Sequence, residues 1–349
     1  MHLVSIPTAA NHKPNRLPIY IFTSVKSIIR FITAILTLFL FSSWGFFAHY
    51  KINRLAIFTL PKGMAAFYKA NIQYLTIHAV TADKRRYTDS TEAPRHFFDA
   101  DHYGKFPFKT VPHKWADASA KYNKDSVIKY GTVPWTIQYQ YYKLVRAFKA
   151  HDTSSILHTS ADLGHYIADA SVPLHLTTNY DGQLTNQKGL HALWESRLPE
   201  LFAPKYHLYI GKARYIENPL SQAFIICRSS FKCVDSVVTF ERQLSRHFPA
   251  DKKYAVTQRG QRKVTDYSPE YSLAYHKLLH GMVERRMRSA ILSVGSFWYS
   301  AWVDAGQPNL DRLIDQNLMQ TEKLKVDSED VGFKKPLTVF VKTKHHKKD

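Results

Sequence analysis

The stretch GHYIADASVPLH, from Gly164 to His175, joins a helical hydrophobic pattern to polar side chains that can bind metal ions. His165 and Asp169 are four residues apart, which places both side chains on one face of a helix, one turn apart. Pro173 then ends the helix, and His175 can turn back from the loop that follows. The stretch therefore predicts one side of a metal site, provided that other segments supply the remaining ligands.

A second segment, LHALWES, repeats the same spacing with His191 and Glu195. Two such helices facing each other offer five nitrogen and oxygen ligands to a shared point, and zinc accepts this combination. A single pair is more simply read as a hydrogen-bonding pair on the surface. Two pairs together with His175, all within 31 residues, favour a shared metal site.

Apolar residues recur every three to four positions over much of the chain, which predicts an all-α fold: a single, mostly helical domain with long ordered loops. The region 81–112 reads as a long ordered loop, whereas 203–270 shows no clear pattern. We expect 271–305 to form one long helix or a helix pair that breaks near Gly295. The other predicted helices are 62–80, 134–150, 152–170 and 189–202.

The composition supports a folded protein with affinity for anions. The chain has 349 residues, of which 45% are hydrophobic, and it holds 18 His against 13 Gly. Its net charge of +20 favours polyanionic ligands or an anionic membrane surface. Neither a Gly-rich phosphate loop nor a G-x-S-x-G nucleophile motif occurs, and no segment indicates a protein partner.

The N-terminal segment predicts export. Residues 31–43, FITAILTLFLFSS, follow two basic residues and resemble a secretory signal that is cleaved after Ser43. The domains would then be a signal or membrane segment at 1–43, a catalytic domain at 44–333 and a basic tail at 334–349. Alternatively the uncharged run 31–48 remains as a membrane anchor. In an exported protein, Cys227 and Cys233 could form a disulfide, although their spacing alone leaves this open.

Upstream segments contain further candidate ligands. Trp44 and His49 directly follow the predicted cleavage site, and a free amine at Trp44 could bind a metal. Asp83 lies beside three basic residues that end at Arg86, and His96 begins the segment HFFDADHY.

In order, these motifs read W-x4-H, D, H-F, H-x3-D-x5-H and H-x3-E, a set that covers residues 44–200. This pattern resembles the trinuclear-zinc superfamily, which contains the bacterial zinc-dependent phospholipases C and the single-strand-specific nucleases of fungi and plants. The resemblance implies three zinc ions and hydrolysis of phosphodiester bonds. The first ion would be held by Asp83, His96, His165 and Asp169; the second by His175, His191 and Glu195; the third by the amine and carbonyl of Trp44, with His49 and the shared Asp169.

The resemblance also implies roles in substrate binding. Asp83 would orient or deprotonate the attacking water, and Arg86 would bind a phosphoryl oxygen. Phe97 corresponds to a ring that lines the substrate pocket, and Asp99 to a position that contacts a base in the nucleases. Glu195 resembles the phospholipases, because the nucleases usually have Asp there.

The substrate is left open between phospholipid and single-stranded nucleic acid. Phe47 stands where choline-binding phospholipases have an acid, and this difference, like the positive charge, favours nucleic acid. The alternative function is a membrane-tethered zinc-binding protein without hydrolytic activity, in which residues 31–48 stay uncleaved. A purely structural zinc site is disfavoured, because such sites prefer Cys ligands.

Overall fold

The computed structural model describes residues 46–259 and 262–314 of the chain. The chain divides into two units, Met1–Ser43 and Trp44–Asp349, and the described residues all belong to the second. The predicted signal segment, Trp44 and the basic tail at 334–349 lie outside the described residues. Within the described ranges, no helix has both the length and the apolar character needed to cross a bilayer.

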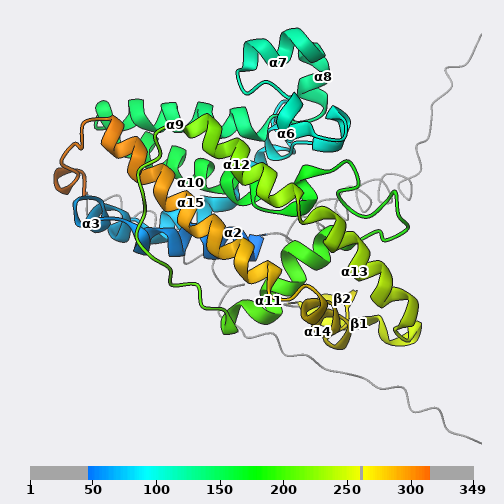
Figure 1. Cartoon of the computed structure of the whole chain (residues 1–349). Coiled ribbons are helices and arrows are strands. Elements are labelled where there is room, and N and C mark those ends of the chain that lie inside the picture. The colour runs from blue at the N-terminus through cyan, green and yellow to red at the C-terminus, as the bar shows by residue number, and fades with distance from the viewer. Residues whose placement is uncertain (1–45, 260–261, 315–349) are drawn as a thin grey trace, which may run out of the picture. The chain divides into compact units, whose positions relative to one another are not determined.

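The predicted all-α class is confirmed: helices dominate the described residues, and one antiparallel hairpin accompanies them (Figure 1). In the hairpin, Tyr254 is opposite Tyr267 and Thr257 is opposite Val264. Its strands are β1 (Tyr254–Arg259) and β2 (Arg262–Tyr267). The α-helices are α2 (Phe46–Ala56), α3 (Lys62–Ala70), α4 (Ile72–Ile77), α5 (Thr81–Arg85), α6 (Pro107–Thr110), α7 (Trp115–Tyr122), α8 (Lys124–Lys129), α9 (Val133–Lys149), α10 (Thr153–Ala170), α11 (Leu198–Phe202), α12 (Pro219–Phe231), α13 (Val234–His247), α14 (Pro269–Leu278) and α15 (Met282–Asp304).

Helix α10 is the central element of the core. Asp152 begins it by accepting a hydrogen bond from the backbone N–H of Ser155, which satisfies one of the free donors of the first turn. Every residue from Thr159 to Ala170 is buried, because α2, α9 and α15 all pack against this helix. Helix α10 therefore brings its polar side chains into the interior of the protein.

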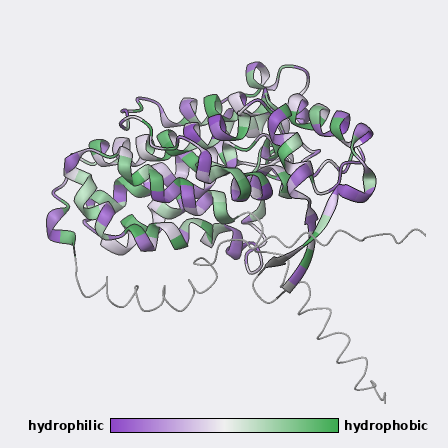
Figure 2. Ribbon diagram, turned by 90° about the horizontal axis from the view of Figure 1, so that it is seen from below, coloured by the Kyte–Doolittle hydropathy of each residue, from purple (hydrophilic) through white to green (hydrophobic). Residues whose placement is uncertain are grey.

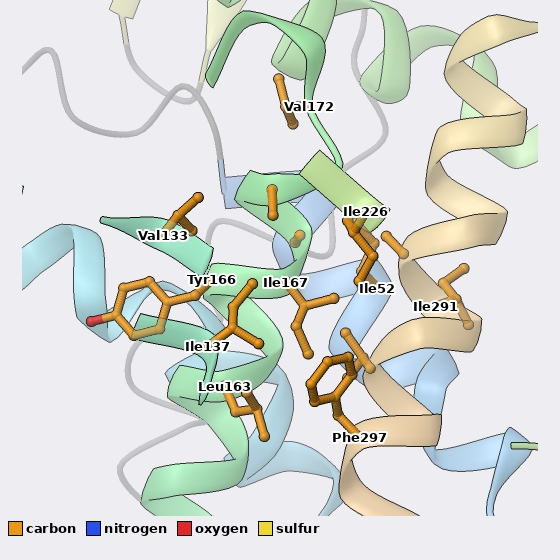
Figure 3. Close-up of a cluster of buried hydrophobic side chains, with 14 of the residues drawn as sticks. Ile52, Val133, Ile137, Leu163, Tyr166, Ile167, Val172, Ile226, Ile291 and Phe297 are labelled. Carbon is orange, nitrogen blue, oxygen red and sulfur yellow. The ribbon is translucent and has the colours of Figure 1, made fainter. Parts of the chain in front are cut away.

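Apolar side chains fill the spaces around α10. Figure 3 shows Ile52 of α2, Ile137 of α9 and Phe297 of α15 in one cluster with Leu163 and Ile167 of α10. Burial of each such side chain stabilises the fold by roughly 1.5–3 kcal/mol. Hydrophilic and hydrophobic residues both occur along most of the helices (Figure 2), as expected for helices with one buried face.

Helices α2 and α10 approach each other closely. The Nδ2 group of Asn53 on α2 donates to the backbone carbonyl of Ala161 on α10. A Cβ atom at Gly164 would lie 2.2 Å from Oδ1 of Asn53, so any larger residue would displace the side chain of Asn53. The rings of His49 and His165 stack across this contact with their centroids 4.3 Å apart.

Several predicted elements differ from the structure. Residues 269–304 do form a helix pair, but the break falls at His280 and Gly281, which both have positive φ angles, and not near Gly295. Gly295 lies inside α15, where a Cβ atom would be 1.9 Å from Oγ1 of Thr59, so this glycine serves close packing. The region 203–270 contains α12, α13 and the hairpin, and 81–112 contains short helices. The open question of a disulfide is answered: Cys227 and Cys233 are both free thiols.

Candidate metal centre

Eight of the nine predicted metal ligands converge on one cluster in the interior of the protein. The ligand atoms fall into groups of three, and within each group they lie within 4.8 Å of one another. The ninth predicted ligand, Trp44, is outside the described residues. The eight are His49 (α2), Asp83 (α5), His96 (the 3-10 turn Ala93–His96), His165 and Asp169 (α10), His175 (the 3-10 turn Pro173–Leu176), His191, and Glu195 (the π-helical turn Ala192–Arg197).

Asp169 is at the centre of this cluster and is 1% exposed. Its Oδ2 atom lies 2.9 Å from Nδ1 of His96 and 3.2 Å from Nε2 of His165. Its Oδ1 atom lies 3.3 Å from Nε2 of His49 and 3.9 Å from Nε2 of His175. The two oxygens therefore face different sets of imidazoles, as expected of a carboxylate that bridges two metal ions.

The first group, called position one, consists of Asp83, His96, His165 and Asp169. Nδ1 of His96 and Nε2 of His165 are 3.0 Å apart, and Oδ1 of Asp83 lies 3.6 Å and 3.8 Å from them. Around a tetrahedral zinc ion with bonds of about 2.0–2.2 Å, ligand atoms are about 3.3–3.6 Å apart. The distances in position one span this range, so these residues fit a tetrahedral zinc ion.

The second group, position two, consists of His175, His191 and Glu195. Oε2 of Glu195 lies 2.6 Å from Nε2 of His191 and 3.4 Å from Nε2 of His175. The π-helical turn that carries Glu195 is of a kind often found at functional sites. Three protein ligands with a free position are typical of catalytic zinc.

The third group, position three, consists of His49, Asp169 and Glu195. Oε1 of Glu195 lies 3.1 Å from Nε2 of His49, while Oε2 of the same carboxylate faces position two. The sequence assigned Glu195 to the second ion alone. In the structure Glu195 also reaches the third group, so both carboxylates connect adjacent positions.

Hydrogen bonds outside the cluster fix the orientation of three imidazoles. Nδ1 of His165 donates to the carbonyl of Ala79 at 2.8 Å, and Nδ1 of His175 donates to the carbonyl of His96 at 2.8 Å. Nδ1 of His191 donates to the carbonyl of Tyr180 at 3.2 Å. Because a carbonyl only accepts, each Nδ1 carries a proton, so Nε2 is the nitrogen that faces the cluster and can bind a metal ion.

The charges of the cluster favour a bound cation. Burial opposes ionisation of Asp169 and Glu195, yet the surrounding imidazoles hold the pKa of both carboxyls well below their usual values. Burial would lower the pKa of His96, but the carboxylates of Asp169 and Glu92 outweigh it and raise the pKa to about 9. The pKa of His165 is also raised, because nearby carboxylates outweigh its burial. Without a metal, protons therefore supply the positive charge that these carboxylates require.

The predicted substrate-binding residues lie next to the cluster in sequence, and the structure gives each a defined environment. Arg86 is half-exposed, and its guanidinium lies 3.6 Å from Oδ1 of Asp83. Phe97 is partly buried, with its ring against Gly131. Asp99 donates its backbone N–H to Tyr130, and burial together with Asp101 raises the pKa of its carboxyl to about 7. The roles assigned to these residues remain predictions.

The sequence analysis missed Glu92, whose side chain is fully buried beside His96. Its Oε1 atom is 3.4 Å from Nε2 of His96, on the side of the ring that faces away from the cluster. The two residues have the i, i+4 spacing that identified the other pairs, so a search for this spacing would have found Glu92. No family model and no curated protein matches the chain in sequence.

Proposed function

We propose that the protein is an exported zinc-dependent hydrolase of phosphodiester bonds, similar to the trinuclear-zinc superfamily of phospholipases C and single-strand-specific nucleases. The observation that carries this proposal is the cluster of eight imidazole and carboxylate side chains, whose ligand atoms lie within 4.8 Å of one another in groups of three. The cluster contains His and carboxylates without Cys, which is typical of catalytic zinc.

When bound, zinc ions supply Lewis acidity, which lowers the pKa of water toward neutrality and neutralises the phosphoryl oxygens. The side chains of this protein then orient the reactants. Asp83 is the most exposed carboxylate of position one, with 23% of its side chain accessible, so it can accept the proton of an attacking water. Arg86 lies on the same exposed side and would bind a non-bridging phosphoryl oxygen.

The surface of α6 and its neighbours supports an anionic substrate. Lys105 and Lys109 both lie over the exposed ring of Phe106, with their Nζ atoms 5.6 Å and 5.4 Å from its centroid. Lysines around an exposed aromatic ring suit the phosphates of a lipid surface or the backbone and bases of a single strand. Both substrates therefore have to be assayed in parallel.

The test compares hydrolysis of phosphatidylcholine vesicles with hydrolysis of single-stranded DNA by the zinc-loaded protein. We expect one of them to be cleaved, and cleavage to stop when a chelator removes the zinc. Arg86→Ala should lower kcat/KM by about 10- to 100-fold, because a charge-assisted hydrogen bond is lost. Lys84→Ala, an exposed neighbour, is the matched control and should leave kcat/KM unchanged. Zinc binding without cleavage of either substrate would instead support a membrane-tethered zinc-binding protein.

A further inference from the structure

The carboxylate of Glu92 is the meeting point of a buried network beside position one. The hydroxyl of Tyr166 donates to its Oε1 atom, and NH1 of Arg95 donates to its Oε2 atom at 3.0 Å. Nε of Arg85 lies 3.4 Å from Oε2, and Nε2 of His96 lies 3.4 Å from Oε1. The side chain is 0% exposed, so its negative charge is balanced entirely by these partners.

This network joins the three elements that carry position one. Arg85 lies on α5 two residues after Asp83, and its guanidinium makes two bonds, of 3.0 Å and 2.9 Å, to the carboxylate of Asp162 on α10. The same guanidinium donates to the hydroxyl of Tyr166, which follows His165 on α10. Glu92 thus connects α5 and α10 to the short turn that ends at His96.

His96 also differs from the other imidazoles of the cluster. It presents Nδ1 to position one, whereas the others present Nε2, and its outer nitrogen faces a full negative charge. The outer nitrogens of His165 and His175 bond to neutral backbone carbonyls. A carboxylate behind a metal-binding imidazole fixes the ring orientation and raises the basicity of the ligand atom.

We propose that Glu92 is a positioning residue for position one: its carboxylate holds His96 with Nδ1 toward the metal and strengthens that ligand. This inference rests on the proposed zinc cluster. The alternative is that Glu92 only stabilises the core, as a buried ion pair does when its partners are satisfied. The chain supplies a matched control in Glu241, which is also 0% exposed and lies in a separate network with Lys253 and Tyr271.

The experiment measures zinc affinity by competition with a chelating dye, using the metal-free full chain. Glu92→Gln should weaken the affinity for one zinc equivalent by about 10- to 100-fold, the usual effect of losing such a hydrogen-bond partner. The affinities for the other equivalents should be unchanged. That equivalent should be the one abolished by His96→Ala. Glu241→Gln removes a buried charge of the same kind elsewhere and should leave every zinc affinity unchanged.

Tyr166→Phe provides a second variant in case Glu92→Gln does not fold. It keeps the carboxylate but removes one hydrogen bond to it, so the affinity for the same zinc equivalent should fall by about 2- to 5-fold. The proposal is wrong if Glu92→Gln leaves all zinc affinities unchanged, or if it weakens all equivalents alike. If one equivalent weakens as expected but neither substrate is cleaved, Glu92 keeps its role and the hydrolase assignment fails.

Discussion

The protein buries carboxylates in two regions, and different kinds of neighbouring groups balance their negative charge. Around Glu241 on α13, the protein itself supplies donors: Nζ of Lys253 at 3.0 Å, the hydroxyl of Tyr271 at 2.6 Å and the amide of Gln187 at 2.5 Å. Around Asp169, the nearest atoms are imidazole nitrogens, which can bind either a proton or a metal ion. Fixed donors balance the charge in the first region, whereas the second depends on protons or a cation held by its imidazoles.

This difference distinguishes a structural cluster, around Glu241, from a candidate metal site, around Asp169. Burial of a carboxylate is costly unless donors or cations surround it. Glu241 meets that requirement with a lysine and two neutral donors, whereas Asp169 and Glu195 meet it only when protons or metal ions occupy the cluster. The kind of group around a buried carboxylate, more than burial or the number of acidic residues, therefore favours the Asp169 cluster as the candidate cation site.

The largest effect is expected from Asp169→Asn. The amide cannot bridge two cations, so position one and position three should both lose zinc, while position two keeps its three ligands. We expect activity to fall by on the order of 1,000-fold, because the loss removes Lewis acidity from the site. Zinc analysis after dialysis, with circular dichroism as the control for folding, measures the outcome. Full zinc content in the folded variant would refute the bridging role.

Glu241→Leu should separate stability from metal binding. It leaves the ammonium of Lys253 and the hydroxyl of Tyr271 without their buried acceptor. We expect the free energy of unfolding to fall by about 3–5 kcal/mol, with zinc content unchanged in the folded protein. Denaturant unfolding and zinc analysis test this, and loss of zinc at temperatures where the fold is intact would contradict it.

Zinc uptake should release protons at neutral pH. The pKa of His96 is raised to about 9, so its imidazole is protonated at pH 7 in the metal-free protein and must lose that proton to bind zinc. The stability contributed by this proton is complete below the unfolded pKa of about 6.5 and is lost as the pH rises through about 9. An indicator dye in weakly buffered solution measures the release, which should decrease from pH 7 to pH 9. A release that is constant over this range would contradict the shift.

The smallest effect concerns His49 and the N-terminus. His49→Ala should abolish the zinc equivalent of position three, where His49 is one of three ligands, although its imidazole also lies within 4.8 Å of ligand atoms of Asp83 and His165. Since Glu195 also reaches this position, a chain that keeps residues before Trp44 should still bind the third zinc, although more weakly than a chain trimmed to begin at Trp44. Zinc titrations of both forms, with His102→Ala as the matched control, decide this. A third equivalent that appears only after trimming would show that Glu195 does not serve position three.

The sequence predicted most of the ligands because their spacing is local. The pairs His165/Asp169 and His191/Glu195 lie one turn apart, so helical periodicity alone puts each pair on one side of a helix. Helix α10 was predicted at 152–170 and begins and ends within one residue of that range. Local periodicity and the cap at Asp152 were sufficient for this element.

Contacts between distant segments were not visible in the sequence. The contact between Glu195 and His49 joins residues 146 positions apart, and it depends on how α2 and the π-helical turn pack. The sequence analysis placed the helix break near Gly295, whereas it lies at Gly281. The sequence alone does not distinguish a glycine that ends a helix from one that allows close packing. Arg85 and Arg86 likewise read as equal surface charges, although Arg85 is bound to the buried Asp162.

The missing side chain at Gly164 has a consequence for the spacing of the proposed metal positions. Because α2 rests directly on α10 at this residue, one imidazole from each helix can share a single carboxylate. Adding one methyl group at Gly164 would displace the side chain of Asn53, which joins α2 to α10, without altering any ligand. Gly164→Ala would then be a way to change the geometry of the proposed metal centre while every predicted ligand remained in the sequence.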